Sequence, residues 1–434
     1  MVQRALQFGE ELRRRRLAAG LSLTWLSEQV HYSKGQLSKV ERGLKRPNHE
    51  LARHCDAVLG ANGALSALVP TPPARRGGQA LGDDEEVWLM QLSRDGENWF
   101  RPMSRRTLLA AGATSVAGMS IGGPMPQVVD TTLLGVWRAQ FDQYRRLGQV
   151  ISSDLLLPTL IAQTHTLREQ SAGTGQRTRE ELLRLTSRYA EYIGWLVQET
   201  GDDQAALWWT QRAVDLAAAG GDQDLAAYGL VRRALVSLYR NDPAQTIELA
   251  RQAQQHDAPP RVLGLAAQRE AQGHALAGDY DSCMRSLDNA RTLLGRHASD
   301  ADPLVLGTTN LRDPAAMITG WCLYDLGRPK EAAQIIGDEL ARIPPQAVRA
   351  HLRYGVRHAL AHAAAGELEQ ACELTRRLLD NAVRVRSATI AVDMRALART
   401  LSRHLTHPAV RELIPELGTA LHSMTRHTNG MRTV

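Results

Sequence analysis

Residues 33–43 read Ser-Lys-Gly-Gln-Leu-Ser-Lys-Val-Glu-Arg-Gly, and this stretch decides how the N-terminal part of the chain is interpreted. Serine commonly caps the start of a helix and glycine commonly ends one, so Ser33 and Gly43 predict a short helix over 34–41. Leu37 and Val40 are three residues apart and share one face of that helix. The remaining, mostly polar residues therefore point away from the core.

Similar short helices are expected on both sides of this stretch. Apolar residues spaced three, four and seven apart predict a helix that ends at Gly20, and Ser22 begins a second helix with an apolar face. Pro47 and Asn48 open a further helix, which Gly60 closes. We therefore expect an all-α fold that begins with a five-helix domain over residues 1–69.

Charge is distributed unevenly along the 434 residues. Residues 1–76 hold 13 Lys and Arg against 6 Asp and Glu, whereas the remainder holds 39 against 40. Three of the four lysines fall within twelve residues of one another, at Lys34, Lys39 and Lys45. A small basic module on a nearly neutral body indicates a polyanionic partner, and a merely solubilising surface is the alternative.

The N-terminal segment resembles the helix-turn-helix domain of phage-repressor-like (XRE) transcription regulators. The matching residues are Leu12-Arg13, Arg16, Gly20-Leu21-Ser22, Leu26, Leu37-Ser38-Lys39-Val40-Glu41-Arg42-Gly43 and Pro47. In such a domain one helix crosses the DNA backbone, and the next, here 34–41, lies in the major groove. The resemblance implies double-stranded DNA as partner and a homodimer on a palindromic operator. It also implies an ion pair between Arg16 and Glu41.

Placement of the second helix in a groove predicts which residues meet DNA. Base contacts are expected from Lys34, Gly35, Gln36, Ser38 and Lys39, with Gly35 leaving room rather than bonding. Phosphate contacts are expected from Ser22, Thr24, Ser33, Arg42, Lys45 and Arg46. The sequence departs from the family pattern at Leu23, Ser27 and His31, and Leu23 removes one expected DNA contact.

Residues 70–127 are expected to be a linker or docking segment because prolines and glycines crowd its start. Ser104-Arg105-Arg106 is similar to a twin-arginine export signal, but about 100 residues precede it, so we expect a linker there and a cytoplasmic protein. No run of 18 apolar residues predicts a membrane span.

Catalytic and metal motifs are weak. Residues 118–122 fit G-x-S-x-G, but no strand is expected before them, and His358 and His362 lack the glutamate of H-E-x-x-H. The four cysteines contain no C-x-x-C pair. We expect no enzyme activity, no cofactor and no metal, and cysteines that serve as small core residues.

Residues 128–434 are expected to be paired helices throughout. Turn-like dipeptides begin at residues 201, 241, 278, 327 and 366, and a small residue follows five positions after each start: Ala206, Thr246, Cys283, Ala332 and Ala371. Small side chains let two antiparallel helices approach closely. The pattern resembles the tetratricopeptide (TPR) repeat, with Gly278-Asp279-Tyr280 as its closest copy, and predicts an α-solenoid.

A solenoid of helix pairs offers a concave groove lined by the first helix of each pair. The expected lining residues are Tyr192, Trp195, Tyr228, Arg232, Tyr239, Asn310, Trp321, Tyr324, Arg353, Tyr354 and Arg357. They predict either a site for a peptide or small signal molecule or simply side chains that fill the gaps between helices. The whole chain is interpreted as a dimeric, sequence-specific regulator that senses such a signal. The alternative is a DNA-anchored scaffold whose repeats bind a protein.

Overall fold

The computed structural model describes residues 2–69, 86–91, 99–104, 131–296 and 306–429. Contacts along the chain define two compact units. Unit 1 holds the N-terminal helices together with most of residues 226–424, and unit 2 holds most of residues 75–225. The described N-terminal residues, 2–69, are called the head below.

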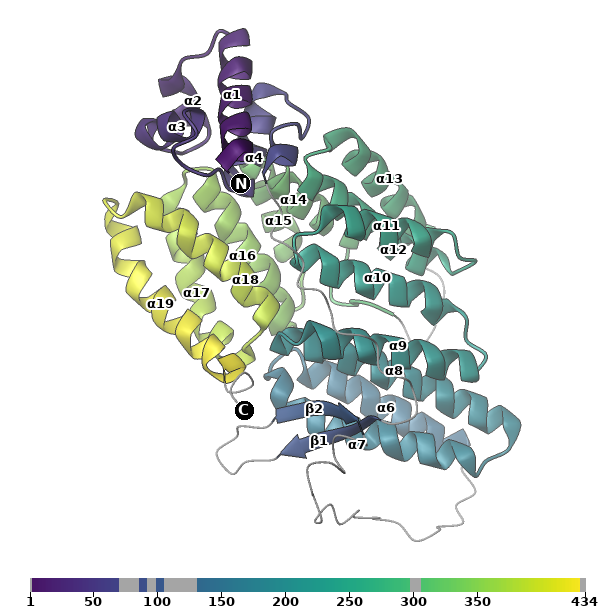
Figure 1. Ribbon diagram of the computed structural model, residues 1–434. Helices are drawn as coiled ribbons and strands as arrows, with labels where there is room; N and C mark the ends of the chain where they lie inside the picture. The colour runs from purple at the N-terminus through teal and green to yellow at the C-terminus, as the bar shows by residue number, and fades with distance from the viewer. Residues whose placement is uncertain (1, 70–85, 92–98, 105–130, 297–305, 430–434) are drawn as a thin grey trace. The chain divides into compact units, whose positions relative to one another are not determined.

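The head consists of short helices around one apolar core (Figure 1). They are α1 (Val2–Ala18), α2 (Leu23–Gln29), α3 (Lys34–Glu41), α4 (His49–Leu59) and the 3-10 helix η1 (Ser66–Leu68). Phe8, Leu12, Leu26 and Leu37 are fully buried in the core. The five expected helical segments are thus present, and the fifth is a single 3-10 turn.

Local chemistry explains where the head helices begin and end. The hydroxyls of Ser22 and Ser33 accept hydrogen bonds from backbone N–H groups in the first turns of α2 and α3. Gly20 and Gly43 have positive φ values of 68° and 71°, which end the preceding helices. His31 adopts a φ of 51° at the break between α2 and α3, a conformation that His tolerates better than most residues.

Unit 2 contains α6 (Thr131–Leu147), α7 (Ser153–Ala172), α8 (Gln176–Thr200) and α9 (Asp203–Ala219). It also contains a two-stranded antiparallel hairpin of β1 (Glu86–Gln91) and β2 (Trp99–Ser104), in which Glu86 pairs with Ser104. The all-α architecture predicted for the chain is confirmed, and this hairpin, within the segment 70–127, is a small β element that the sequence analysis did not predict. The β-favouring run Val-Trp-Leu at 87–89 is the sequence signal for a strand.

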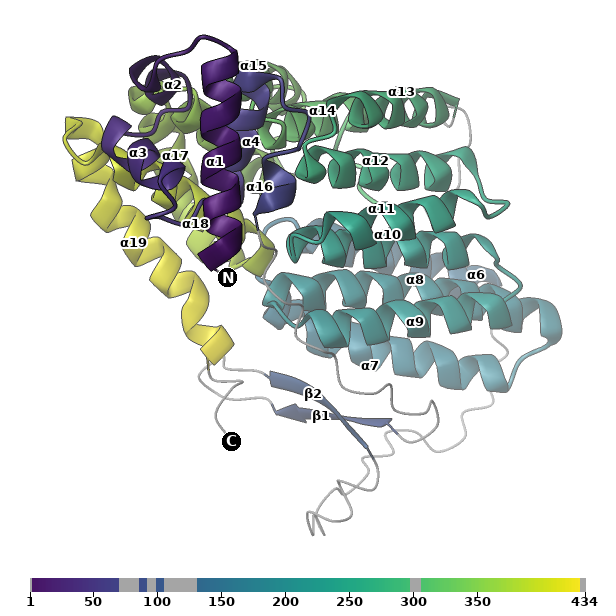
Figure 2. The same ribbon diagram turned by 45° about the horizontal axis from the view of Figure 1, so that its top comes forward.

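Unit 1 continues from the head into further helices, many of them in antiparallel pairs. These are α10 (Asp224–Tyr239), α11 (Pro243–Gln254), α12 (Pro260–Ala277), α13 (Tyr280–Arg296), α14 (Pro314–Asp325), α15 (Pro329–Leu340), α16 (Val348–Ala364), α17 (Leu368–Val385), α18 (Ala388–Leu401) and α19 (Pro408–Asn429), with the 3-10 helix η2 (Ser402–His404) between the last two. Helices α11, α12 and α13 lie side by side (Figure 2). This is the solenoid-like architecture that the sequence predicted.

The predicted turns are confirmed at all five places. Gly201, Asn241, Gly278, Gly327 and Gly366 each join two helices with φ between 57° and 93°. The small residues five positions after each turn start are almost completely buried between the helices of a pair: Ala206, Thr246, Cys283, Ala332 and Ala371. Close helix approach therefore explains the repeated small residues.

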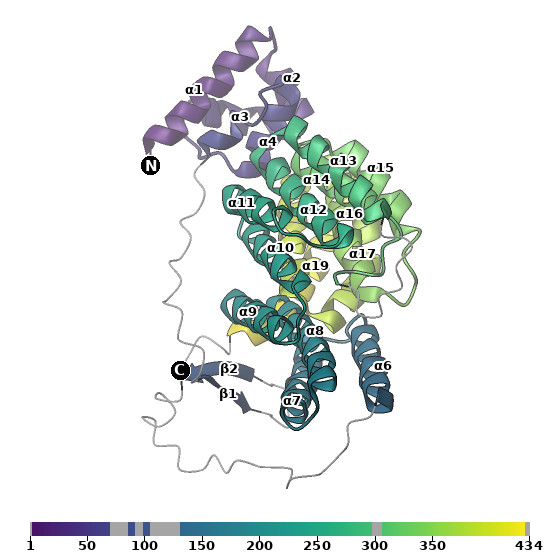
Figure 3. The same cartoon turned by 90° about the vertical axis from the view of Figure 1, so that its right-hand side faces the viewer.

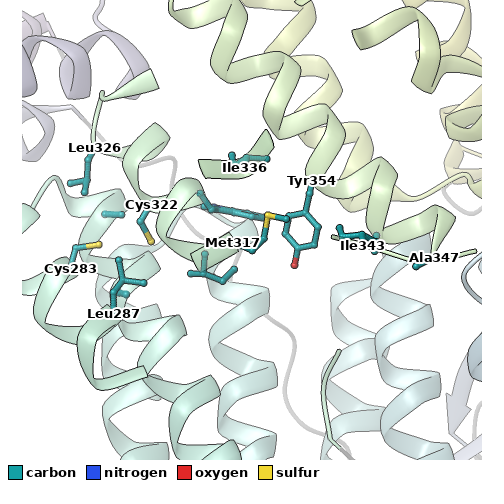
Figure 4. Packing of buried hydrophobic residues seen from close by; sticks show 14 residues of the cluster. Cys283, Leu287, Met317, Cys322, Leu326, Ile336, Ile343, Ala347 and Tyr354 are labelled. Atoms are coloured by element: carbon teal, nitrogen blue, oxygen red, sulfur yellow. The ribbon is translucent and has the colours of Figure 1, made fainter. Parts of the chain in front are cut away.

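The core between α12 and α16 is apolar and contains two of the cysteines. The Cys283 and Cys322 side chains point toward one another from α13 and α14, beside Leu287 and Leu326 (Figure 4). All four cysteines are free and buried, as expected for small core residues. Within the described residues, no helix has the length and apolar character that crossing a membrane requires.

Candidate nucleic-acid interface

Helix α3 presents one buried face and one exposed face. Leu37 and Val40 are buried in the head core. On the opposite side Lys34, Gly35 and Lys39 are exposed, and Gln36 and Ser38 are partly exposed. The five residues predicted to contact bases therefore lie on the solvent side of α3, where no residue that the structure describes covers the three exposed ones.

Gly35 is exposed, and the packing around it does not require a residue without a side chain. A Cβ atom built at Gly35 would meet no atom within 4 Å. At Gly9 in α1, by contrast, a Cβ would lie 2.4 Å from the Val40 carbonyl oxygen, so that glycine allows α1 to cross the end of α3. Gly35 therefore costs helix stability without a packing benefit inside this chain.

The residues predicted to contact phosphates flank α3 on both sides. Ser22, Thr24 and Ser33 are exposed at the N-termini of α2 and α3, where backbone N–H groups favour anions. Arg42, Lys45 and Arg46 are exposed in the segment that follows α3. The Arg42 guanidinium donates a hydrogen bond of 3.1 Å to the Ser38 carbonyl, which holds it against the end of α3.

The expected pair between Arg16 and Glu41 is confirmed. Two hydrogen bonds of 2.7 and 2.9 Å join the guanidinium to the carboxylate, and both side chains are nearly buried. Arg16 also donates to the Leu21 carbonyl at 2.8 Å. Hydrogen bonding to Glu41 raises the pKa of Arg16. This bidentate contact ties α1, the turn before α2 and the end of α3 into one rigid frame.

Two exposed apolar residues beside α3 were not predicted as functional. Trp25 on α2 is 40% exposed, and Leu44, directly after α3, is 69% exposed. Trp25 lies off the apolar stripe formed by Leu26 and Val30, and that is the only sequence signal for its exposure. Apolar groups at these positions can contact sugar or thymine methyl groups at the rim of a groove.

Helix α4 attaches the head to the rest of unit 1. Figures 1 and 3 show α4 as the helix of the head on the side of the repeat helices. Three of the left-handed turns meet the head. A Cβ at Gly278 would lie 2.7 Å from Gly63 Cα, one at Gly327 would lie 2.9 Å from the Arg53 carbonyl oxygen, and one at Gly366 would lie 3.1 Å from the His31 ring. We call these turns the seat.

An ion pair closes the contact between α4 and the end of α18. Arg403 in η2 donates hydrogen bonds of 2.6 and 3.3 Å to the Glu50 carboxylate, and its guanidinium lies 4.2 Å from the centre of the Tyr32 ring. Burial alone would raise the pKa of Glu50, but the charge and hydrogen bonds of Arg403, together with the charges of His54 and Arg53, outweigh burial and the pKa is lowered. The Tyr32 hydroxyl and Asn48 lie 3.3 Å apart, which connects the same contact to the N-cap of α4.

The seat leaves the exposed face of α3 uncovered. The head meets the repeat helices through His31, Tyr32, Glu50, Arg53 and Gly63, and none of these is among the predicted DNA contacts. The head can therefore be held by the repeats and present α3 to a partner at the same time.

The predicted groove residues lie on the first helices of the pairs, with one exception. Tyr192 and Trp195 stack on α8 within unit 2, with ring centres 5.6 Å apart. The others lie on α10, α14 and α16 of unit 1: Tyr228, Arg232, Tyr239, Trp321, Tyr324, Arg353, Tyr354 and Arg357. The placement of Asn310 on a helix was wrong, because Gly307 turns the chain there and α14 begins only at Pro314.

Most of the groove aromatics are core residues. Tyr192, Tyr228, Trp321, Tyr324 and Tyr354 are all buried. The edges of Tyr239 and Tyr354 face the ring of Trp321, with centres 6.3 and 6.4 Å apart. The interpretation that aromatic rings fill the gaps between helices therefore holds for these five.

His358 and His362 are in contact on α16, with Nε2 atoms 3.0 Å apart, and His362 also contacts Glu367. Burial lowers the pKa of His358 to about 4. Within the described residues no group of three or more potential ligands surrounds a metal position. The twin-arginine pair at 105–106 and the G-x-S-x-G segment at 118–122 lie outside the described residues.

Comparison with known proteins identifies the head. Residues 7–69 match the family described as "Helix-turn-helix domain". No curated protein matches the chain significantly. Among solved structures, a Rap protein complexed with competence and sporulation factor is similar, with 14% identity over 69% of this chain and 93% of that one and a TM-score of 0.40.

The turns and buried small residues described above establish the repeat architecture. The chain thus carries an N-terminal helix-turn-helix domain, followed by a body of paired helices that resembles a TPR solenoid.

Proposed function

We propose that this chain is a sequence-specific DNA-binding regulator of transcription. Its head reads an operator with α3, and its helical body dimerises and senses a peptide or small-molecule signal in the cytoplasm. The observation that carries the proposal is the uncovered outer face of α3, with Lys34, Gly35 and Lys39 exposed, inside a helix-turn-helix domain. A helix of this size with an exposed polar face fits the major groove.

The contacts divide into those that select sequence and those that supply affinity. Lys34 and Lys39 can donate to guanine O6 and N7, Gln36 can bond adenine, and Ser38 can bond either. Gly35 allows the backbone of α3 to approach the bases. Ser22, Thr24 and Ser33 at helix N-termini and Arg42, Lys45 and Arg46 after α3 bind phosphates irrespective of sequence.

A single head offers few base contacts, which favours a homodimer with two heads on a palindromic site. The repeat body then supplies the dimer interface and the signal site. A ligand changes operator affinity by binding one arrangement of the two heads more tightly than another.

The proposal is tested by sequencing the DNA fragments that co-purify with the full-length protein. We expect a recurrent palindromic sequence. Recovery of random fragments would contradict sequence-specific binding. A stoichiometric protein partner on the body, without an effect of any ligand on operator affinity, would favour the DNA-anchored scaffold instead.

Two substitutions separate the two kinds of contact. Lys39→Ala should reduce the preference for operator over random DNA by about 1–3 kcal/mol, because it removes a base contact. Arg46→Ala should weaken both complexes equally and lower the salt slope by about one, because it removes a phosphate contact. Fluorescence anisotropy at several salt concentrations measures both effects. Identical behaviour of the two variants would contradict this assignment.

A further inference from the structure

Polar side chains from three helices of unit 1 lie near one another. Arg269 extends from α12, Tyr228 and Tyr239 from α10, and Arg353 and Tyr354 from α16. The charge of Arg269 interacts with the hydroxyl groups of all three tyrosines and with Arg353. The Arg353 guanidinium donates a hydrogen bond of 2.8 Å to the Tyr239 hydroxyl. Two cations and three phenols thus lie close to one another.

The neighbouring Arg357 is an arginine with a structural role, and its charge is compensated by carboxylates of the same chain. Its guanidinium lies 2.9 Å from Asp393, 3.6 Å from Asp325 and 3.5 Å from the centre of the Trp321 ring. Although burial opposes the charge, the two carboxylates outweigh it and the pKa of Arg357 is raised. Arg357 is compensated by its own chain.

Arg269 has no such compensation. Within the described part of the chain it donates one hydrogen bond, to the amide oxygen of Gln272, and no Asp or Glu side chain contacts it. Burial lowers the pKa of Arg269, whereas the pKa of Arg357 is raised. A desolvated cation without a carboxylate is costly to keep, and proteins retain such groups mainly where a ligand supplies the counter-charge.

A second polar group at the same place also lacks a partner. Gln272 is fully buried, and its Nε2 amide group has no hydrogen-bond acceptor among the described residues. Buried polar groups are normally satisfied, so the amide indicates an absent acceptor. Arg269 itself is half-buried, so part of its side chain remains exposed. Two neighbouring donor groups, one charged and one neutral, therefore have fewer acceptors than they can use among the described residues.

We propose that Arg269, Gln272 and Arg353 form a binding site for an anionic group, a carboxylate or a phosphate, on a small ligand. Arg269 supplies a positive charge and a planar pair of donors, and Gln272 supplies a neutral donor. Arg353 supplies a second positive charge, and its hydrogen bond to the Tyr239 hydroxyl holds it in place. That this ligand is the regulatory signal rests on the proposed function, but its binding does not.

Isothermal titration calorimetry on the full-length protein tests the site with three probes. These are a pool of short peptides with free C-terminal carboxylates, the same pool as C-terminal amides, and inorganic pyrophosphate. Saturable binding of the first pool alone identifies a peptide carboxylate, and saturable binding of pyrophosphate identifies a phosphate ligand. In either case Arg269→Met should weaken binding by on the order of tenfold to a hundredfold, because a charged partner is removed. Arg233→Met, at an exposed position of α10, is the control and should bind like wild type.

Stability without any probe gives an independent readout. Because Arg269 lacks a carboxylate, Arg269→Met should leave the melting temperature unchanged or raise it. A structural arginine would show the opposite, a lower melting temperature. Arg269→Met should also leave DNA affinity unchanged in the absence of a probe, so a failure of the anion site is distinguishable from a failure of the regulator account.

Three results would overturn the anion site. One is the absence of saturable binding by every probe up to about 1 mM. Another is binding that Arg269→Met does not weaken. The third is a melting temperature of Arg269→Met several degrees below that of wild type. If wild type binds a probe but no specific DNA, the anion site stands and the regulator proposal fails.

Discussion

At the scale of single residues, the head contains side chains that serve packing and others that do not. Gly9 allows α1 to cross α3, and the ion pair between Arg16 and Glu41 fixes the end of α3. Gly35 and the exposed lysines serve neither purpose. A residue that lowers helix stability and whose added Cβ would meet no described atom of its own chain indicates a partner that needs the space.

Gly35→Ala tests this argument directly. Alanine is a better helix former, so the variant should gain about 0.5–1 kcal/mol of stability. Operator affinity should fall because the added methyl group occupies space between α3 and the bases. Denaturant unfolding and fluorescence anisotropy measure the two quantities.

The matched control is Gly418→Ala in α19, where a Cβ would also meet no atom within 4 Å. It should gain similar stability without any change in affinity. Unchanged operator affinity in Gly35→Ala would show that DNA does not approach this face.

At the scale of helices and turns, much of the architecture could be predicted from the sequence. The caps Ser22 and Ser33 and the five turns were predictable because each depends on residues a few positions apart. The hairpin of β1 and β2 was not, because prolines and glycines at the start of the segment favoured a linker. The placement of Asn310 on a helix also failed, since the loop before α14 is longer than the repeat pattern suggests.

The contact between the head and the repeat helices could not be predicted from the sequence, for a different physical reason. Glu50 and Arg403 are separated by more than three hundred residues, and no periodicity connects them. From the sequence, the glycines were expected only to form turns between helices. The structure shows that Gly278, Gly327 and Gly366 also leave room for the head to approach. Similarly, Arg269 on α12, which defines the anion site, was not predicted, because the expected lining residues of the groove are mainly aromatic.

A double-mutant cycle tests whether the ion pair between Glu50 and Arg403 stabilises the contact between the head and the repeat helices. Glu50→Ala and Arg403→Ala should each destabilise unit 1, and the double variant should be less destabilised than the sum. We expect a coupling energy of about 0.5–3 kcal/mol, because the pair is largely buried and hydrogen-bonded. The exposed pair Glu373–Arg377 on α17 is the control and should couple by less than about 0.5 kcal/mol. Strictly additive losses at Glu50 and Arg403 would contradict the contact.

At the scale of the whole molecule, buried histidines at the contact between the head and the repeats make the stability of the protein depend on pH. His54 on α4 is buried, and burial lowers its pKa to about 4 from 6.5. Glu50 opposes this shift, while Arg53, Arg403 and His31 reinforce it. His31 and His404 also have lowered pKa values, mainly because of burial. The contact between head and seat therefore favours neutral imidazoles.

Stability should therefore fall as the pH is lowered from about 6.5 toward 4, since the unfolded chain binds protons that folded His54 excludes. At pH 5 the loss from His54 alone should be about 2 kcal/mol relative to pH 7.5. Glu50, whose pKa is lowered from 4.5, adds a further loss only below about pH 4.5. Denaturant unfolding at several pH values measures the effect. His54→Gln should flatten the profile between pH 6.5 and 5, whereas His165→Gln, at an exposed position, should not. A profile unaffected by His54→Gln would contradict the buried neutral state.

The central claim, that the outer face of α3 contacts DNA, can be measured on the wild-type protein because the chain has only four lysines. Lys34, Lys39 and Lys45 lie on or directly after α3, and the exposed Lys330 on α15 is an internal control. Acetylation of each lysine is followed by mass spectrometry with and without the DNA recovered from the protein. We predict that DNA slows modification of Lys34, Lys39 and Lys45 severalfold and leaves Lys330 unchanged. Equal modification of all four lysines in the presence of saturating DNA would contradict the claim.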